Sequence, residues 1–254
     1  MALPCAAEVG GLEELVDFVA TKADSTPAWS ADSETKVDMM GMAMALKGTI
    51  LVKGEMSIME NTMDMGGQKM TMRQVVDENG VLWSENAGGG RKPMVFKVSA
   101  EEREKATAAT SAVGSPVDPS KAPQDMLKEM QGFFDLTFKG VVPLYDRKSY
   151  LVEGKAKPDA VDKLDKTGMM QQMGMALDGI RMWFDTEDGL TRKVEMLGKE
   201  GKPFITQVFS NVNVKPEITE DTFKYTPPEG AHVIDPNEMA GMGMPGAPGP
   251  GAGR

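Results

Sequence analysis

The sequence predicts an α+β domain in which a few helices accompany one large antiparallel sheet. Apolar and polar residues alternate with period two from about residue 29 to 98 and again from about 136 to 213. Short turn signals such as Asn79-Gly80 separate these runs, which indicates a meander of hairpins rather than βαβ units. Apolar residues recur at helical spacing in only two longer segments, so helices are the minor component.

The first helix is expected over residues 12–24. Leu12, Leu15, Val16 and Val19 form one apolar stripe, and Pro27 ends the segment. A short polar helix is expected over 99–111, with Ser99 as its N-cap and Glu102 completing a capping box. A second amphipathic helix follows the Pro- and Ser-rich loop at 112–124, and a weaker helical stretch spans 159–176.

The longest strand signal lies in the segment DMMGMAMALKGTILVK. Its even positions from Met40 to Val52 are all apolar apart from Gly48, where we expect a bulge or bend. The alternation indicates one strand or a pair. Further strands are expected at EMSIME, QKMTMRQVV, GVLWSE, LTFKGVV and KSYLVEGKAK, and in three runs between 179 and 214.

The sequence divides into three parts. Residues 1–11 look like a leader remnant or cloning segment, residues 12–235 form the domain, and residues 236–254 form a Gly-, Pro- and Met-rich tail expected to be disordered. Pro4 argues against lipid attachment at Cys5, which is more simply an exposed thiol. No stretch is long and apolar enough for a membrane span.

Composition excludes several classes of function. The 254 residues include 28 Lys and Arg against 38 Asp and Glu, giving a formal charge of −10, which disfavours nucleic acid and anionic membranes as partners. One Cys and one His exclude internal disulfides, thiolate zinc sites and multi-histidine metal centres. His232 is the only possible imidazole base and has no evident nucleophile beside it, so we expect no enzyme, no catalytic residue and no cofactor.

The 23 methionines are the most unusual feature of the composition. Methionine fills apolar space that is irregular or changes shape, whereas Leu and Val specify one packing. The expected cavity-lining residues are Met40, Met42, Met44, Leu46, Ile50, Val52, Met56, Ile58, Met70, Met72, Met182 and Met196. A helix bearing Met126, Met130, Phe133 and Phe134 is expected to cover them. The same positions also fit an ordinary closed core.

The C-terminal third resembles the outer-membrane lipoprotein carrier (LolA) family and its lipoprotein-sorting relatives. The similarity rests on a Trp-bearing strand with an acidic turn (GIRMWFDTEDG), a GKP hairpin, the strand FSNVNV, and the closing FKYTPPEG before Val-Ile. The N-terminal helix, Trp29, the KGTILVKGEM hairpin and VVDENGVLWSE follow the family's order, so the resemblance covers residues 12–235.

The resemblance implies a strongly curved antiparallel sheet, an open and incomplete β-barrel, with helices packed in its mouth as a lid. It implies a monomeric, non-catalytic periplasmic protein that holds lipoprotein acyl chains or free lipid and exchanges them with a membrane-bound donor or acceptor. In typical carriers an arginine follows the first hairpin and holds the lid. Here the stretch reads KGEMSIME, so gating by that residue does not carry over.

Methionine pairs leave one alternative open. Met42/Met44, Met63/Met65, Met70/Met72, Met173/Met175 and Met242/Met244 repeat the Met-x-Met spacing, and soft thioethers select Cu(I). Alternate residues of any strand share a face, so a Met-rich strand shows this spacing without binding metal. The alternative function is therefore a Met-rich Cu(I)-binding protein of the cell envelope.

Overall fold

The computed structural model describes residues 9–39, 42–65, 67–105, 121–164, 176–219 and 221–234. Apart from residues 9–11, the expected leader segment and the expected tail lie outside these ranges, as do parts of the predicted helices over 99–111 and 159–176.

The described helices lie at the expected positions. They are α1 (Leu12–Ser25), α2 (Ala100–Lys105), α3 (Pro123–Phe133), α4 (Ala160–Leu164) and the 3₁₀ turn η1 (Lys199–Gly201). Helix α3 begins with proline, which suits a first turn because its missing N–H has no intrahelical partner there. Phe134, expected on this helix, is instead the first residue of the next strand, because the backbone becomes extended there.

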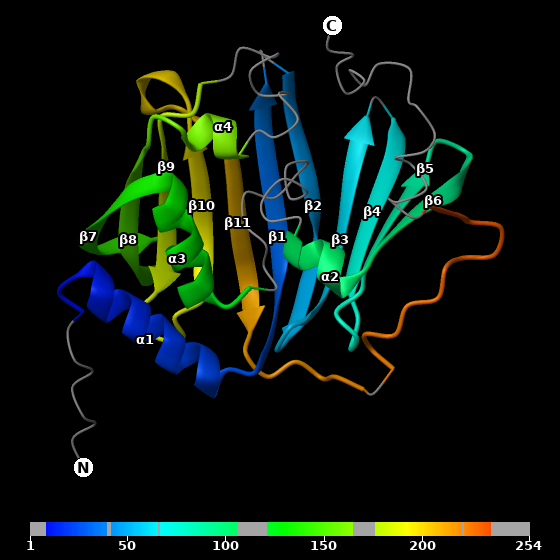
Figure 1. Ribbon diagram of the computed structural model, residues 1–254, viewed down its shortest axis with the longest axis horizontal. Helices are drawn as coiled ribbons and strands as arrows, with labels where there is room; N and C mark the ends of the chain where they lie inside the picture. The colour runs from blue at the N-terminus through cyan, green and yellow to red at the C-terminus, as the bar shows by residue number, and fades with distance from the viewer. Residues whose placement is uncertain are drawn as a thin grey trace, which may run out of the picture.

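The described strands form one sheet (Figure 1). They are β1 (Ala28–Met39), β2 (Met42–Lys53), β3 (Met56–Met65), β4 (Gln68–Val76), β5 (Leu82–Gly88), β6 (Arg91–Val98), β7 (Phe134–Leu144), β8 (Arg147–Ala156), β9 (Gly179–Asp185), β10 (Thr191–Leu197), β11 (Pro203–Asn213) and β12 (His232–Ile234). The spatial order is β12-β6-β5-β4-β3-β2-β1-β11-β10-β9-β8-β7. Every neighbouring pair is antiparallel except β12 beside β6.

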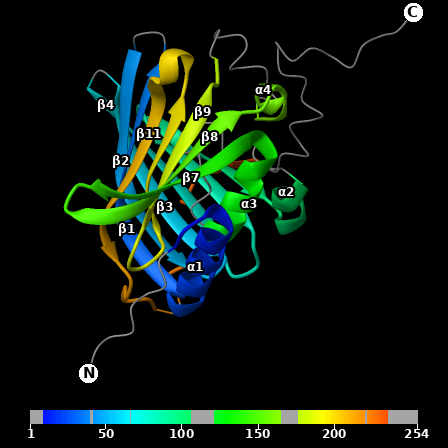
Figure 2. The same ribbon diagram turned by 90° about the vertical axis from the view of Figure 1, so that its left-hand side faces the viewer.

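The pairing of β1 with β11 joins two meanders into the single sheet. Residues Asp32 to Val37 pair with Ser210 to Ile205, so the first and last long strands meet at the centre. The outermost strands, β7 and β12, do not pair with each other, and the sheet stays open while it curves around the helices (Figure 2). The expected α+β fold, an open curved antiparallel sheet with helices on one side, is confirmed.

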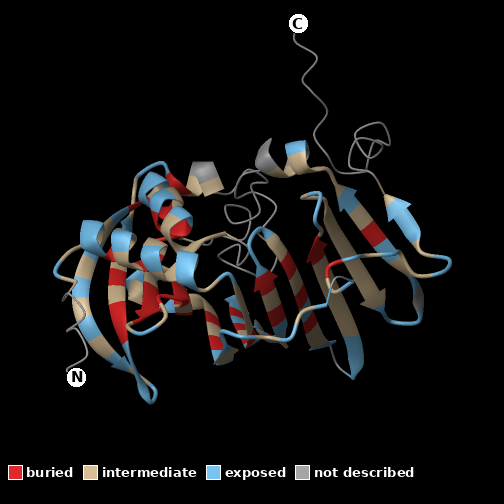
Figure 3. Ribbon diagram, turned by 90° about the horizontal axis from the view of Figure 1, so that it is seen from below, coloured by how far each residue is buried: buried red, intermediate tan, exposed pale blue. Residues whose placement is uncertain are grey.

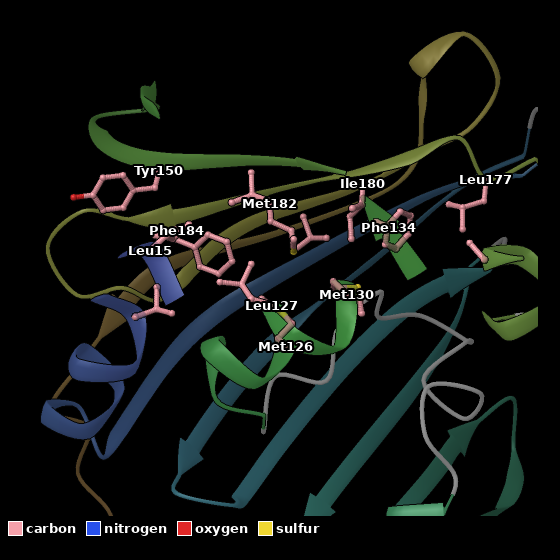
Figure 4. Close-up of a cluster of buried hydrophobic side chains, with 14 residues drawn as sticks. Leu15, Met126, Leu127, Met130, Phe134, Tyr150, Leu177, Ile180, Met182 and Phe184 are labelled. Atoms are coloured by element: carbon pink, nitrogen blue, oxygen red, sulfur yellow. The ribbon is translucent and has the colours of Figure 1, made fainter. Parts of the chain in front are cut away.

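One half of the sheet carries the main apolar core. Leu15 of α1 and Leu127 of α3 pack with side chains of β7 to β10, including Phe184, which has no exposed surface (Figure 4). We call the face of the sheet that these helices cover the inner face, and the opposite one the outer face. Buried positions nevertheless extend across the sheet beyond the helices (Figure 3).

The C-terminal segment runs along the outer face after β11. The Tyr225 hydroxyl donates to Glu85 at 2.9 Å, and its ring lies 5.3 Å from that of Trp83 on β5. Burial raises the pKa of Tyr225, as does its bond to the Glu85 carboxylate. The segment thus links the central strand β11 to β12 at the far edge (Figure 1).

Gly48 does not form the bulge that its position suggested. The register of β2 with both β1 and β3 runs through it without a shift, so β2 is a single continuous strand. A Cβ atom on Gly48 would lie 1.7 Å from the Glu60 carbonyl oxygen and 2.6 Å from Asn61 Oδ1. The residue is glycine because the backbone of β3 approaches it too closely for a side chain.

Gly48→Ala is expected to lower the free energy of unfolding by about 1–3 kcal/mol, because β2 and β3 must shift to admit the methyl group. Chemical denaturation measures the change. The matched control is Gly132→Ala in α3, where a Cβ meets nothing within 4 Å and loss of glycine flexibility is expected to stabilise the helix by up to about 1 kcal/mol. Equal effects of the two substitutions would refute the close approach.

Candidate functional site

The register identifies which side chains share the inner face of β1 to β6 and β11. Pairs such as Val37–Met44, Ile50–Met59 and Met63–Met70 lie directly opposite each other, and alternate residues follow on the same side. The set comprises Trp29, Ala31, Ser33, Thr35 and Val37; Met44, Leu46, Gly48, Ile50 and Val52; Ser57, Met59, Asn61 and Met63; Met70, Met72, Gln74 and Val76; Leu82, Ser84 and Asn86; Met94, Phe96 and Val98; and Ile205, Gln207 and Phe209.

None of these side chains carries a charge. The charged residues of β1 to β5, among them Glu34, Glu60 and Arg73, alternate onto the outer face. On β6, Lys97 also faces outward, whereas Lys92 at the start of the strand follows the alternation of Met94 and is the exception among the described side chains. An isolated charge is costly to remove from water, so this segregation suits a face that contacts apolar material.

Six of the residues predicted to line a cavity share this inner face. Met44, Leu46, Ile50 and Val52 lie on β2, and Met70 and Met72 lie on β4. Met182 and Met196 face the same side on β9 and β10, where Met182 is fully buried in the cluster beneath α3. Met40 and the side chain of Met42 lie outside the described residues.

Two predicted lining residues lie on the wrong face. Met56 pairs with Lys53 and Ile58 with Leu51, so both point to the outer side of the sheet. The two-residue turn at Gly54-Glu55 sets this register, and a shift of one residue moves every side chain to the opposite face. The same turn would have identified Met59 and Met63 as the inner residues of β3.

The helix residues predicted as a lid are part of the apolar core. Met126 and Met130 are buried beside β7 to β10, Phe133 packs partly against them, and Phe134 belongs to β7 itself. Whether α3 also covers a bound ligand stays a prediction.

Four uncharged polar residues interrupt the apolar face at its centre. They are Ser33, Thr35, Asn61 and Gln207, and all are buried. Ser33 of β1 and Asn61 of β3 pair with Gly48 of β2 from its two sides, and Thr35 of β1 pairs with Gln207 of β11. The Ser33 hydroxyl donates to Asn61 Oδ1 at 3.2 Å, crossing the position where Gly48 has no side chain. Sequence periodicity missed this group, because its members meet only through pairing between distant strands.

Methionine is concentrated on β3 and β4 of the inner face. Met63 and Met70 are cross-strand neighbours, whose Cβ atoms lie about 5 Å apart in such pairs, and Met72 follows on the same side. Among the described residues, no group of three His, Cys, Asp or Glu side chains could hold a metal ion.

Asp185 and Arg192 are buried charged residues at the turn between β9 and β10. Asp185 accepts hydrogen bonds from Arg147, from Arg192 and from the backbone N–H groups of Glu187 and Asp188. Burial alone would raise the pKa of Asp185, but the bonds from Arg147 and Glu187 N–H and the nearby guanidinium charges lower it to about 2. Burial raises the pKa of Asp188 despite the opposing charge of Arg192. This network fixes the β9–β10 turn.

His232 lies on the edge strand β12 beside Met94 of β6, and its side chain is exposed.

No helix among the described residues is long and apolar enough to cross a membrane.

The sequence matches no model of a known protein family and no curated protein. An uncharacterised conserved protein from Thermus thermophilus is similar in structure, with a TM-score of 0.51, 11% identity, and coverage of 88% of this chain and 98% of that one. LprF from Mycobacterium bovis gives a TM-score of 0.40 at 13% identity, covering 86% of this chain and 97% of that one.

A LolA superfamily protein from Nitrosomonas europaea gives a TM-score of 0.33 at 11% identity, covering 87% of this chain and 99% of that one. At such identities the likeness concerns the fold alone. The TM-score of 0.51 shows a fold shared with the Thermus thermophilus protein, and the resemblance to the LolA family stays a prediction.

Proposed function

We propose that this protein is a non-catalytic carrier that binds the acyl chains of a lipid or lipoprotein on the inner face of β1 to β6. The observation that supports this best is the absence of charged side chains from the described inner face of β1 to β5. The packed core beneath α1 and α3 occupies the other half of the sheet.

Acyl chains would bind mainly because their hydrocarbon leaves water, which contributes about 0.8 kcal/mol per buried methylene. Met44, Met63, Met70 and Met72 are only partly buried and have several rotatable bonds, so they can adapt to chains of different length. Such a face is expected to bind acyl chains with high affinity but to distinguish little between different chains, because it makes few directional contacts.

The proposed setting follows from the resemblance to lipoprotein carriers. The protein would act as a monomer in the periplasm of a bacterium with two membranes and exchange its cargo with a membrane-bound donor or acceptor. The negative net charge agrees with a protein that does not stay on anionic membranes.

Organic extraction of the purified protein followed by lipid mass spectrometry tests the proposal. We expect acyl lipids in stoichiometric amounts. Their absence, together with failure to bind a fluorescent diacylglycerol, would refute lipid carriage.

Met70→Glu is expected to weaken diacylglycerol binding at least tenfold, because it places a carboxylate on the apolar face. The matched control is Thr71→Glu, one residue further on the same strand, similarly half-buried but facing outward. Fluorescence titration measures both affinities. An equal loss in the two variants would show that the inner face is not the binding surface.

Cu(I) binding is a second candidate, supported by the Met63–Met70 pairing with Met72 beside it. A competition titration with a Cu(I) chelator tests it. Submicromolar affinity that disappears in the Met63/Met70/Met72→Leu variant, but persists in Met56→Leu on the outer face, would favour the metal. Unchanged affinity in the triple variant would exclude this site.

A further inference from the structure

The strand pairing places the only histidine of the chain beside a methionine at one edge of the sheet. Strand β12 runs parallel to β6, at the edge opposite β7, and His232 lies directly opposite Met94 (Figure 1). Paired residues of neighbouring strands point to the same side of a sheet, so His232 shares the inner face with Met94. The two residues are far apart in the sequence, and the pairing of β12 with β6 is what brings them together.

A second methionine continues this row across the sheet. Asn86 of β5 pairs with Met94 on one side and with Met72 of β4 on the other. Neighbouring strands lie about 4.8 Å apart, so the backbones at Met72 and Met94 are separated by about 10 Å. Methionine side chains are long and have three rotatable bonds, so these two can extend toward each other over the shorter Asn86.

The two side chains at the edge are accessible. Met94 is 44% exposed, and His232 is exposed as well. No hydrogen bond or ion pair within the described residues engages the His232 ring. The imidazole and the Met94 sulfur are therefore free to coordinate a ligand from solvent.

The chemistry of this row suits a soft cation. Thioethers select Cu(I), and imidazole also suits copper, whereas hard cations such as Ca²⁺ need several oxygen ligands. The described inner side of β4 to β6 carries no carboxylate. Lys92 is a cation on the same side at the start of β6, but it is exposed, so solvent screens its charge.

We propose that His232, Met94 and Met72 form a binding site for Cu(I) at the edge made by β6 and β12. The imidazole and the Met94 sulfur supply two ligands from adjacent strands, and Met72 supplies the third. The site is separate from the Met63–Met70 pair and does not depend on lipid carriage. Since β12 is three residues long, a metal bound between it and β6 also holds this short strand against the sheet.

Anaerobic titration of the full-length, untagged protein with chelator-buffered Cu(I) tests the site, with Ag(I) as a redox-inert second probe. The imidazole NMR signals provide the direct readout, because the chain has one histidine. We expect the first equivalent of metal to shift the His232 signals and to slow the amide hydrogen exchange of residues 232–234. Metal uptake that leaves the His232 signals unchanged, or no uptake at all, would overturn the site.

Each proposed ligand is removed in turn by His232→Ala, Met94→Leu and Met72→Leu. Loss of a group that merely hydrogen-bonds to a metal ligand costs about 10–100-fold in affinity, so each variant is expected to weaken binding of the first equivalent at least about tenfold. Unchanged affinity in His232→Ala or Met94→Leu would overturn the site. Unchanged affinity in Met72→Leu alone would overturn the assignment of the third ligand.

Two matched controls are expected to retain the affinity. Val233→Ala changes the neighbouring residue of β12, which faces the opposite side, and Met63→Leu/Met70→Leu removes two other inner-face thioethers. Loss of affinity in the double variant, with none in His232→Ala, would assign the metal to Met63 and Met70 and overturn this proposal. Lipid binding is measured separately, so either result leaves the carrier function to its own test.

Discussion

Asp185→Ala is expected to lower the free energy of unfolding by about 3–5 kcal/mol, the range for removing one partner of a buried ion pair. The carboxylate has no exposed surface and accepts from Arg147, Arg192 and two backbone N–H groups. Its removal leaves the Arg192 guanidinium buried with only Asp188 as a charged partner. Arg192 Nη1 already has no hydrogen-bond partner among the described residues. Chemical denaturation at pH 7 measures the loss.

The contribution of Asp185 to the free energy of unfolding decreases as the pH falls. The pKa of Asp185 is about 2 in the folded protein, below the value near 3.9 of an unfolded aspartate, so its contribution is complete above about pH 4 and disappears as the pH falls toward 2. The difference between wild type and Asp185→Ala should therefore shrink in acid.

Glu187→Gln is the control for this prediction. It removes another carboxylate that bonds to Arg147, but one whose side chain is 79% exposed, so the expected loss is below about 1 kcal/mol. A loss as large as that of Asp185→Ala would contradict the importance of burial.

Leu127→Ala is expected to lower the free energy of unfolding by about 2–5 kcal/mol, because the side chain is fully buried where α3 packs against α1 and the sheet. Lys128→Ala is the matched control on the same helix. Its side chain is 63% exposed and its ion pair with Asp125 is a surface contact at 3.8 Å, so little change is expected. Similar losses in both variants would contradict the packing of α3.

The Leu127 variant also tests the lid prediction. Loosening α3 changes the rate of lipid dissociation only if α3 covers the bound lipid. A stopped-flow measurement with the fluorescent diacylglycerol therefore separates a lid from a purely structural helix.

Local sequence signals were sufficient to predict the helices and most of the strands of this fold. Turn residues such as Gly54 and Asn79-Gly80 lie where the hairpins turn, and the stripe of α1 buries Leu15 and Val19 as its spacing indicates. The pairing of β1 with β11 could not be predicted from the sequence, because about 170 residues separate the two strands and no local pattern encodes the contact.

The candidate site was predicted only in part, for the same reason. Alternation along β2 identified Leu46, Ile50 and Val52 correctly as one face. Selecting Met56 and Ile58 by apolarity alone ignored the register set by the turn. The Ser33–Asn61 contact depends on that register and on β1 pairing with β2 at Gly48, so it emerged only from the structure.

The three tryptophans provide the most direct test of the account. Trp29 lies on the inner face against Phe209, whereas Trp83 and Trp183 lie on the outer face beside Lys97 and Lys193. In variants that keep a single tryptophan, brominated diacylglycerol should quench the fluorescence of Trp29 and leave that of Trp83 and Trp183 unchanged. Quenching of Trp83 or Trp183 without Trp29, or no quenching of any, would contradict lipid binding on the inner face.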